Sequence, residues 1–222
     1  MANNKNENIK IILLGESGVG KTNLINVFFG LGFKEFIPSN ISTNCFDGTF
    51  NYNNQDYNYS IWDTAGQELY KSINKMFIRD AKIILIVYSI IDRESFEEVK
   101  FWMDFLKENQ GEKEYIIALI ANKCDLYEKQ IVSDDEGEKL SYELGIDFLT
   151  TSALSLAPSF KNFVNKLITR YIETILKKED KEKNIKINEP NKDKKIKVKK
   201  KFLILILIII IIIISNLQKE VV

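Results

Sequence analysis

The 222-residue chain contains no histidine, only two cysteines and only three prolines. Because Cys45 and Cys124 are isolated and no histidine is available, we expect neither a zinc site nor a disulfide framework, and a reducing compartment is the natural setting. Residues 1–8 are polar and lack an apolar core, so we expect no secretory signal there. Ala2 is not the glycine that N-myristoylation requires.

The formal net charge is zero, but the charge is unevenly distributed along the chain. Residues 1–176 contain 18 Lys and Arg against 25 Asp and Glu, whereas residues 177–222 contain 13 against 6. An acidic body argues against nucleic-acid binding, so we expect no nucleic-acid partner. The basic tail suggests an anionic surface such as a membrane.

One motif lies directly after the apolar run from Ile9 to Leu14 and fits G-x-x-x-x-G-K-[ST] at every fixed position. Its glycines permit a tight turn whose N–H groups can surround phosphates at the start of a helix. The lysine would reach the β- and γ-phosphates, and the threonine hydroxyl would ligate Mg²⁺. The alternative is an ordinary strand-to-helix turn that happens to contain glycines. The predicted phosphate loop consists of Gly15, Glu16, Ser17, Gly18, Val19, Gly20, Lys21 and Thr22.

Strand-like and helix-like patterns alternate after a single hairpin signal, which predicts a mostly parallel α/β sheet with one antiparallel strand and helices on both faces. We expect capping boxes at Ser95 with Glu98 and at Ser133 with Glu136. The last helix should begin at Pro158. Expected strands cover about 9–14, 45–52, 57–62, 82–90, 115–121 and 146–150, and expected helices start near 21, 95, 133 and 158. Each candidate motif follows a strand, where ligands bind in open α/β sheets.

A second motif, N-K-x-D at Asn122, Lys123 and Asp125, indicates which base the bound nucleotide has. The carboxylate of Asp125 can accept hydrogen bonds from N1–H and the 2-amino group of guanine, which adenine does not offer. Alone, four residues of this kind could also be a solvated turn after a strand. A third motif, D-T-A-G-Q at residues 63–67, follows the second strand of the hairpin. The position of N-K-x-D one strand and one helix after it favours guanine recognition.

With these motifs, residues from about Ile9 to Leu176 closely resemble the Ras superfamily of small GTPases, and Trp62 before D-T-A-G-Q-E resembles its Rab branch. The resemblance implies a P-loop fold with a six-stranded sheet and five helices. It also implies a GTPase that cycles between GTP and GDP, requires Mg²⁺, and acts with an exchange factor, an activating protein and effectors. Vesicle trafficking is the implied process.

The resemblance also implies residue roles. Asp63 would hold Mg²⁺ through water, the Gly66 N–H would bind the γ-phosphate, and Gln67 would orient the attacking water, with Lys21 as the second catalytic residue. Phe33 and Lys123 would pack on the guanine base. The Ala153 N–H would meet its O6, and Ser152 and Leu154 would belong to the same nucleotide-binding loop.

Two positions depart from the family pattern. Asn40 stands where the family has a threonine that ligates Mg²⁺ and senses the γ-phosphate; an asparagine carbonyl can coordinate the metal, and Ser39, Ser42 or Thr43 could substitute for it. Leu154 replaces a lysine, which predicts weaker guanine packing. The departure at Asn40 keeps a second hypothesis open, a nucleotide-binding, membrane-attached scaffold with impaired switching. An ATP-using enzyme is disfavoured by Asn122 and Asp125.

The C-terminal segment has no prenylatable cysteine, but Phe202 to Ile214 is an unbroken apolar run of 13 residues after a lysine-rich stretch. As a helix it spans ~20 Å, and extension to Gln218 gives ~26 Å, near the thickness of a thin endoplasmic-reticulum-type bilayer. A core helix, an interfacial helix and a compositional accident are the alternatives. We expect a flexible start (1–8), a GTPase domain (9–176), a charged disordered linker (177–201), a hydrophobic tail anchor (202–218) and a short end (219–222), on the cytoplasmic face of an intracellular membrane.

Overall fold

The structure is a computed structural model and describes residues 8–37, 44–63, 78–109 and 115–188. A single sheet organises these residues, with strand order β2-β3-β1-β4-β5-β6. Only β2 and β3 pair antiparallel, and all other neighbours are parallel. The predicted α/β fold class is confirmed. The strands are β1 (Ile9–Leu14), β2 (Asn44–Tyr52), β3 (Gln55–Asp63), β4 (Ala81–Ser89), β5 (Ile116–Asn122) and β6 (Asp147–Thr150).

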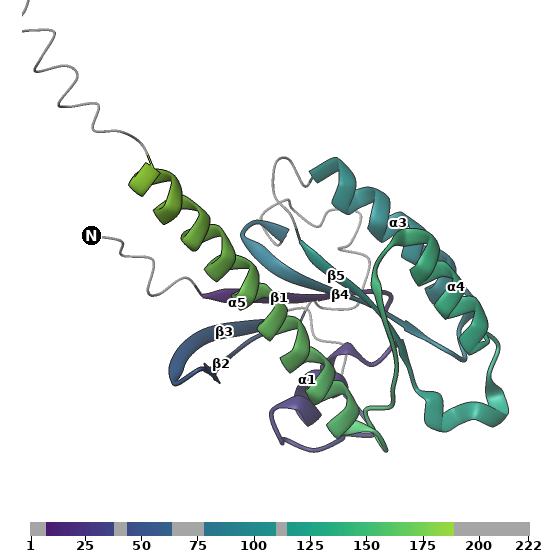
Figure 1. Ribbon diagram of the computed structural model, residues 1–222. Helices are drawn as coiled ribbons and strands as arrows, with labels where there is room; N and C mark the ends of the chain where they lie inside the picture. Colours follow the sequence, from purple (N-terminus) through teal and green to yellow (C-terminus); the bar gives the residue numbers. More distant parts are fainter. Residues whose placement is uncertain (1–7, 38–43, 64–77, 110–114, 189–222) are drawn as a thin grey trace, which may run out of the picture. The chain divides into compact units, whose positions relative to one another are not determined.

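Helices cover both faces of the sheet (Figure 1). Helices α1 and α5 lie over one face, where Phe28 of α1 contacts the rings of Tyr59 and Phe160, and α3 and α4 lie over the other. Strands β1 and β4 are therefore buried on both sides, as near-continuous apolar strands of a parallel sheet should be. The helices are α1 (Lys21–Phe28), α3 (Arg93–Asn109), α4 (Asp134–Leu144), α5 (Ala157–Asn188) and the 3-10 helix η2 (Cys124–Lys129).

The hairpin between β2 and β3 is tighter than the sequence predicts. We expected a loop over Asn53–Asp56, but Tyr52 pairs with Gln55 and only Asn53 and Asn54 form the turn. Both have positive φ, 52° and 61°. Asparagine tolerates the left-handed conformation, and two such residues form the type I′ turn whose twist matches the flanking strands.

The capping box expected at Ser95 with Glu98 is wrong. Helix α3 begins at Arg93, and the Asp92 carboxylate accepts from the N–H groups of Glu94 and Ser95 at 3.1 and 3.3 Å. The Ser95 hydroxyl lies within the first turn and donates back to Asp92 O at 2.8 Å. Asp92 and Ser95 are both residue types that cap helices. Asp92 caps α3 because its carboxylate reaches two N–H groups of the first turn.

The capping box at Ser133 with Glu136 is confirmed, and α4 ends at Gly145 with φ 67°, as expected for a C-terminal glycine. The Arg93 guanidinium pairs with Glu136 at 2.6 Å and also donates to Ile131 O. It thereby joins the start of α3 to the start of α4. The pKa of Glu136 is lowered to about 2, first by this guanidinium and then by hydrogen bonds at Ser133.

Helix α5 continues to Asn188, so the expectation of a disordered linker is wrong for residues 177–188. Contacts divide the chain into a unit Met1–Glu173 and a unit Thr174–Val222. No helix among the described residues is both long enough and apolar enough to cross a membrane, and the expected anchor at 202–218 lies outside them.

Candidate functional site

The predicted phosphate loop joins β1 to α1 at the carboxyl edge of the sheet, and two of its glycines are required by close approach. Gly15 has φ 139°, and a Cβ there would stand 2.0 Å from Val87 O of strand β4. Gly20 has φ 99°, and a Cβ there would stand 2.4 Å from the amide nitrogen of Asn122. The loop is thus seated against two neighbouring strands, and only glycine fits at both seats.

Lys21 is buried at the start of α1 and folds over this loop. Its ammonium group donates to Gly15 O at 2.7 Å and to Glu16 O at 2.8 Å. Burial lowers its pKa to about 8, while the charges of Asp63 and Glu16 act in the opposite direction. A desolvated ammonium group that two backbone oxygens hold at the phosphate loop is suited to bind phosphate oxygens.

Two of the three side chains predicted to bind Mg²⁺, those of Thr22 and Asp63, lie together next to Lys21. The Thr22 hydroxyl, on α1, donates to Asp63 Oδ2 at 2.8 Å, and Asp63 ends strand β3. The other carboxylate oxygen, Oδ1, is buried and has no hydrogen-bond partner among the described residues. Burial raises the pKa of Asp63, against the Thr22 hydrogen bond and the Lys21 charge. A hydroxyl and a carboxylate with one buried oxygen left unpaired fit a hard divalent cation.

Asn122 connects the phosphate loop to the loop after β6. Its amide nitrogen donates to Val19 O at 2.8 Å, and its amide oxygen accepts from Ala153 N at 3.3 Å. The side chain is 1% exposed. The N-K-x-D motif therefore contributes its asparagine to holding three loops together, and the residue that can read the base is Asp125.

Ser152 positions Asp125. Its hydroxyl donates to Asp125 Oδ1 and accepts from the N–H groups of Leu154 and Ser155 at 3.0 and 3.1 Å. Lys123, which lies two residues before Asp125, is half-buried with φ 67°, and burial lowers its pKa. The carboxylate is thus held toward the site by a fixed hydroxyl.

The loop that contains Asp125 is fixed at both ends. Cys124 N donates to Thr151 O at 3.2 Å at its start. At its end, the N–H groups of Ile131 and Val132 both donate to Ile90 O, at 2.8 and 3.0 Å. The base-reading loop is therefore bound to the ends of β4 and β6 as well as to β5.

The remaining predicted residues divide into two groups. Phe33 and Leu154 are 42% and 58% exposed, so their side chains are available to a ligand. Asn40, Gly66 and Gln67 lie outside the described residues. The sequence reasoning missed Asn23, whose carboxamide bonds both backbone groups of Lys34, because nothing in the sequence marks a contact of this kind.

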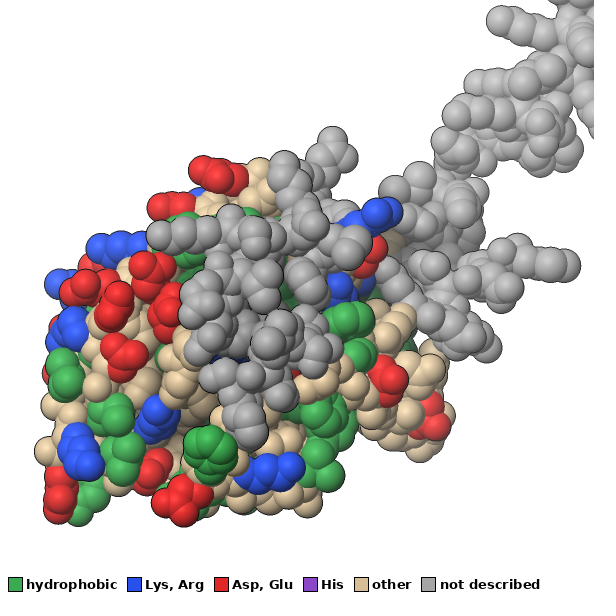
Figure 2. Space-filling model, turned by 180° about the vertical axis from the view of Figure 1, so that it is seen from behind, with side chains coloured by type: hydrophobic (Ala, Val, Ile, Leu, Met, Phe, Trp, Pro, Cys, Tyr) green, Lys and Arg blue, Asp and Glu red, His purple; other side chains and the backbone are tan. Residues whose placement is uncertain are grey.

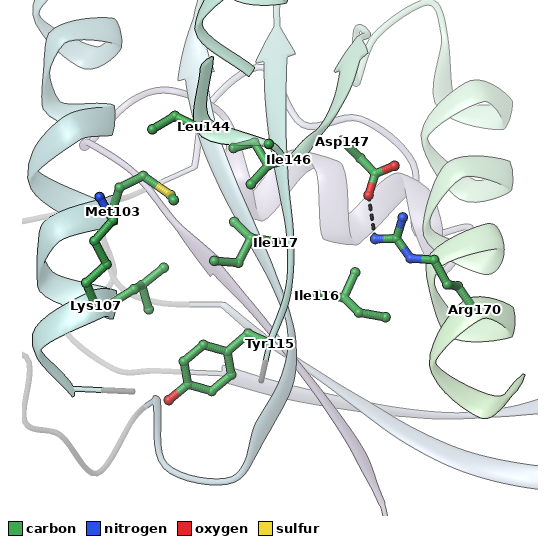
Figure 3. Close-up of a pocket in the computed structure, with 11 residues that line it drawn as sticks. Met103, Lys107, Tyr115, Ile116, Ile117, Leu144, Ile146, Asp147 and Arg170 are labelled. Carbon is green, nitrogen blue, oxygen red and sulfur yellow. Dashed lines mark hydrogen bonds and ion pairs between the residues drawn. The ribbon is translucent and has the colours of Figure 1, made fainter. Parts of the chain in front are cut away.

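The described residues also contain a hollow of about 550 Å³ at the opposite end of the strands (Figure 3). It is lined mainly by apolar side chains of α3, β5 and the loop before β6, with the ion pair of Asp147 and Arg170 at one side. None of the predicted site residues lines it. On the surface, acidic side chains gather over α3 and α4 (Figure 2), in agreement with the acidic body.

Comparison with known proteins gives the family. The Ras family profile matches residues 10–177. Ras-related protein Rab5 of Nicotiana tabacum is 40% identical over 148 residues, which cover 67% of this chain and 74% of that protein. Ras-related protein RABF2a of Arabidopsis thaliana is 40% identical over 150 residues, 68% and 74% of the two chains. For Ras-related protein RHN1 of Nicotiana plumbaginifolia the values are 38% over 152 residues, 68% and 76%. The chain therefore belongs to the Ras superfamily as a Rab-like small GTPase, an enzyme of the class that hydrolyses GTP.

Proposed function

We propose that this chain is a GTP/GDP switch that binds its nucleotide with Mg²⁺ at the carboxyl edge of the sheet and acts in vesicle trafficking. The observation that carries the proposal is the meeting of three sets of side chains at that edge. Lys21 serves the phosphates, Thr22 with Asp63 serves the metal, and Asp125 held by Ser152 serves the base.

Each residue has a separate task in hydrolysis. Lys21 and the loop N–H groups bind and orient the β- and γ-phosphates. Thr22 and Asp63 would hold Mg²⁺, which would supply positive charge against the phosphates. Gln67 orients a water in line with the γ-phosphorus, and Gly66 N–H binds a γ-oxygen. No arginine is placed by motif at the phosphates, so the intrinsic rate is slow and an activating protein supplies an arginine.

A second candidate function rests on Asn40. An asparagine at the position of the γ-phosphate-sensing threonine can coordinate a metal through its carbonyl, but it lacks the hydroxyl. In this alternative the chain binds nucleotide without distinguishing GTP from GDP and acts as a membrane-attached scaffold.

Turnover of GTP by the full chain in detergent micelles, with Mg²⁺, separates the two. For a switch, we expect hydrolysis that Gln67→Leu abolishes, and a chain that binds effectors only with GTP. If the wild type binds GTP without hydrolysing it, and Asn40→Thr restores hydrolysis, the scaffold would replace the switch. If ATP displaced GTP from the chain, both the switch and the scaffold hypothesis would be contradicted.

We also propose that residues 202–218 anchor the chain in a membrane, with the lysines before them on the cytosolic side. The support is the length and apolar character of the run and the basic segment that precedes it. A thin bilayer of the endoplasmic-reticulum type fits a span of ~26 Å. In a protease-protection assay on membranes, a tag after Val222 should be protected, and its digestion without detergent would contradict a spanning anchor.

A further inference from the structure

The segment after α1 is held to that helix at two places. Helix α1 ends in a paired turn, in which Gly30 N donates to Val27 O at 3.2 Å and Leu31 N donates to Asn26 O at 2.8 Å. The second attachment is at Lys34, three residues after Leu31, and Asn23 of α1 makes it. Its amide nitrogen donates to Lys34 O at 2.8 Å and its amide oxygen accepts from Lys34 N at 2.9 Å.

This second attachment holds the backbone next to Phe33, because Phe33 directly precedes Lys34. A carboxamide that pairs with both the N–H and the C=O of one residue fixes the direction of that residue's backbone as well as its place. Phe33 lies between the two attachments and precedes the paired residue directly. The residue is 42% exposed, so its side chain is accessible to a ligand although the backbone beside it is held.

The attachment also lies at the nucleotide end of the molecule. Asn23 is the third residue of α1, next to Thr22 and two residues after Lys21, which serve the metal and the phosphates. Phe33 directly precedes the residue that is bonded to this part of α1, and a partly exposed aromatic side chain there is suited to pack on the base of the same nucleotide. Nothing else among the described contacts ties Lys34 to the body of the domain.

We propose that Asn23 is a positioning residue, which holds Phe33 against the guanine base and thereby sets how long the nucleotide stays bound. This inference rests on the proposed function. Asn23 itself touches neither the base nor the phosphates in this proposal, and it acts only through Phe33. The consequence is that the removal of Asn23 shortens the lifetime of bound GDP without changing the role of Mg²⁺.

The test is the dissociation rate of a fluorescent GDP analogue from the full chain in detergent micelles. Asn23→Ala should release the nucleotide about tenfold faster, the size that the loss of two neutral hydrogen bonds predicts. Phe33→Ala should also release it faster. If Asn23 acts through Phe33, the double variant should release it no faster than Phe33→Ala alone.

Two controls separate positioning from general damage. Asn109→Ala removes an asparagine hydrogen bond to a backbone oxygen at the end of α3, far from the site in the chain, and should leave the rate unchanged. Chelation of Mg²⁺ should accelerate release from wild type and from Asn23→Ala by the same factor. A changed factor would mean that Asn23 acts on Thr22 and the metal, and would overturn the inference.

The remaining outcomes are equally distinct. The inference would be overturned, while the proposed function stands, if Asn23→Ala released the nucleotide at the wild-type rate. The same holds if the two substitutions multiplied their effects on the release rate in the double variant. A wild-type chain that binds no GDP would overturn the proposed function and this inference with it.

Discussion

The side-chain amide of Asn122 donates to the backbone oxygen of Val19 at 2.8 Å, so the base-reading motif and the phosphate loop share one hydrogen bond. The two residues lie 103 positions apart. Both residues are buried, so breaking this hydrogen bond leaves its donor and acceptor without water to replace it. The loops proposed to bind the phosphates and the base are therefore linked directly by one buried side chain.

Replacement of Asn122 tests this link. Asn122→Ala leaves Val19 O and Ala153 N buried without their partner, and we expect a loss of about 2–4 kcal/mol in the free energy of unfolding. GDP affinity should fall as well, because both loops lose their common support. Urea unfolding and equilibrium binding measure the two effects. Asn51→Ala, which removes an exposed hydrogen bond in the β2–β3 hairpin, is the matched control and should change neither.

The pKa of Lys21, lowered to about 8 by burial, predicts how GTP affinity depends on pH. Phosphates favour the charged amine, so above pH ~8 binding must take up a proton and affinity should fall by up to about tenfold per pH unit. Lys21→Met should bind about 100-fold more weakly at neutral pH and show no such slope. Calorimetry in two buffers of different ionisation enthalpy measures the proton uptake directly, and its absence above pH ~8 would contradict this prediction.

The same lowered pKa affects the stability of the nucleotide-free chain. An unfolded lysine has a pKa of 10.5, so between about 8 and 10.5 the unfolded state binds more protons than the folded state. The contribution of Lys21 to the free energy of unfolding therefore rises with pH across that window. Lys21→Met lacks this contribution, so the stability of the wild type should increase relative to that of the variant as pH rises.

The orphaned oxygen of Asp63 predicts the effect of its replacement on metal dependence. Asp63→Asn keeps the shape of the side chain but removes the negative charge that holds a divalent cation. We expect GDP to dissociate about 10–100-fold faster in the presence of Mg²⁺, and chelation to have little further effect. A variant that still responds to chelation as the wild type does would show that Asp63 does not serve the metal.

The hydroxyl of Ser152 predicts base affinity. Ser152→Ala removes the donor to Asp125 and the acceptor for two N–H groups, so the carboxylate loses its fixed direction. GDP affinity should fall about tenfold or more, by the loss of a hydrogen bond to a charged group. Ser155→Ala is the control, because only the backbone of Ser155 takes part and its side chain is exposed. Equal affinities of the two variants would contradict the role of Ser152.

The fold and the chemistry of the site could be predicted from the sequence where one residue type is needed for one reason. Lys21, Thr22 and Asp63 are examples, since their spacing and chemistry indicate a phosphate and metal site, and the structure brings them together. The start of α3 could not be predicted in the same way, because Asp92 and Ser95 are both good caps and only three-dimensional geometry selects one of them. Asn23 left no signal at all, since asparagine on a helix surface usually contacts only water.

The length of α5 illustrates a different difficulty. The lysine-rich and glutamate-rich residues after Leu176 predicted disorder, because they offer few apolar side chains to bury. The same residues are straight-chain types with high intrinsic helix propensity, and the helix continues through them to Asn188. Charge density and helix propensity thus gave opposite predictions, and propensity prevailed.

The loop of Asp125 is tied at both ends to the sheet, by Thr151 O at its start and by Ile90 O at its end. Its conformational entropy is therefore lost when the chain folds, not when the base arrives. In the function proposed above, the guanine base therefore docks on a loop that is already fixed. Much of the free energy gained there is then available to slow nucleotide departure, the property that a timed switch requires.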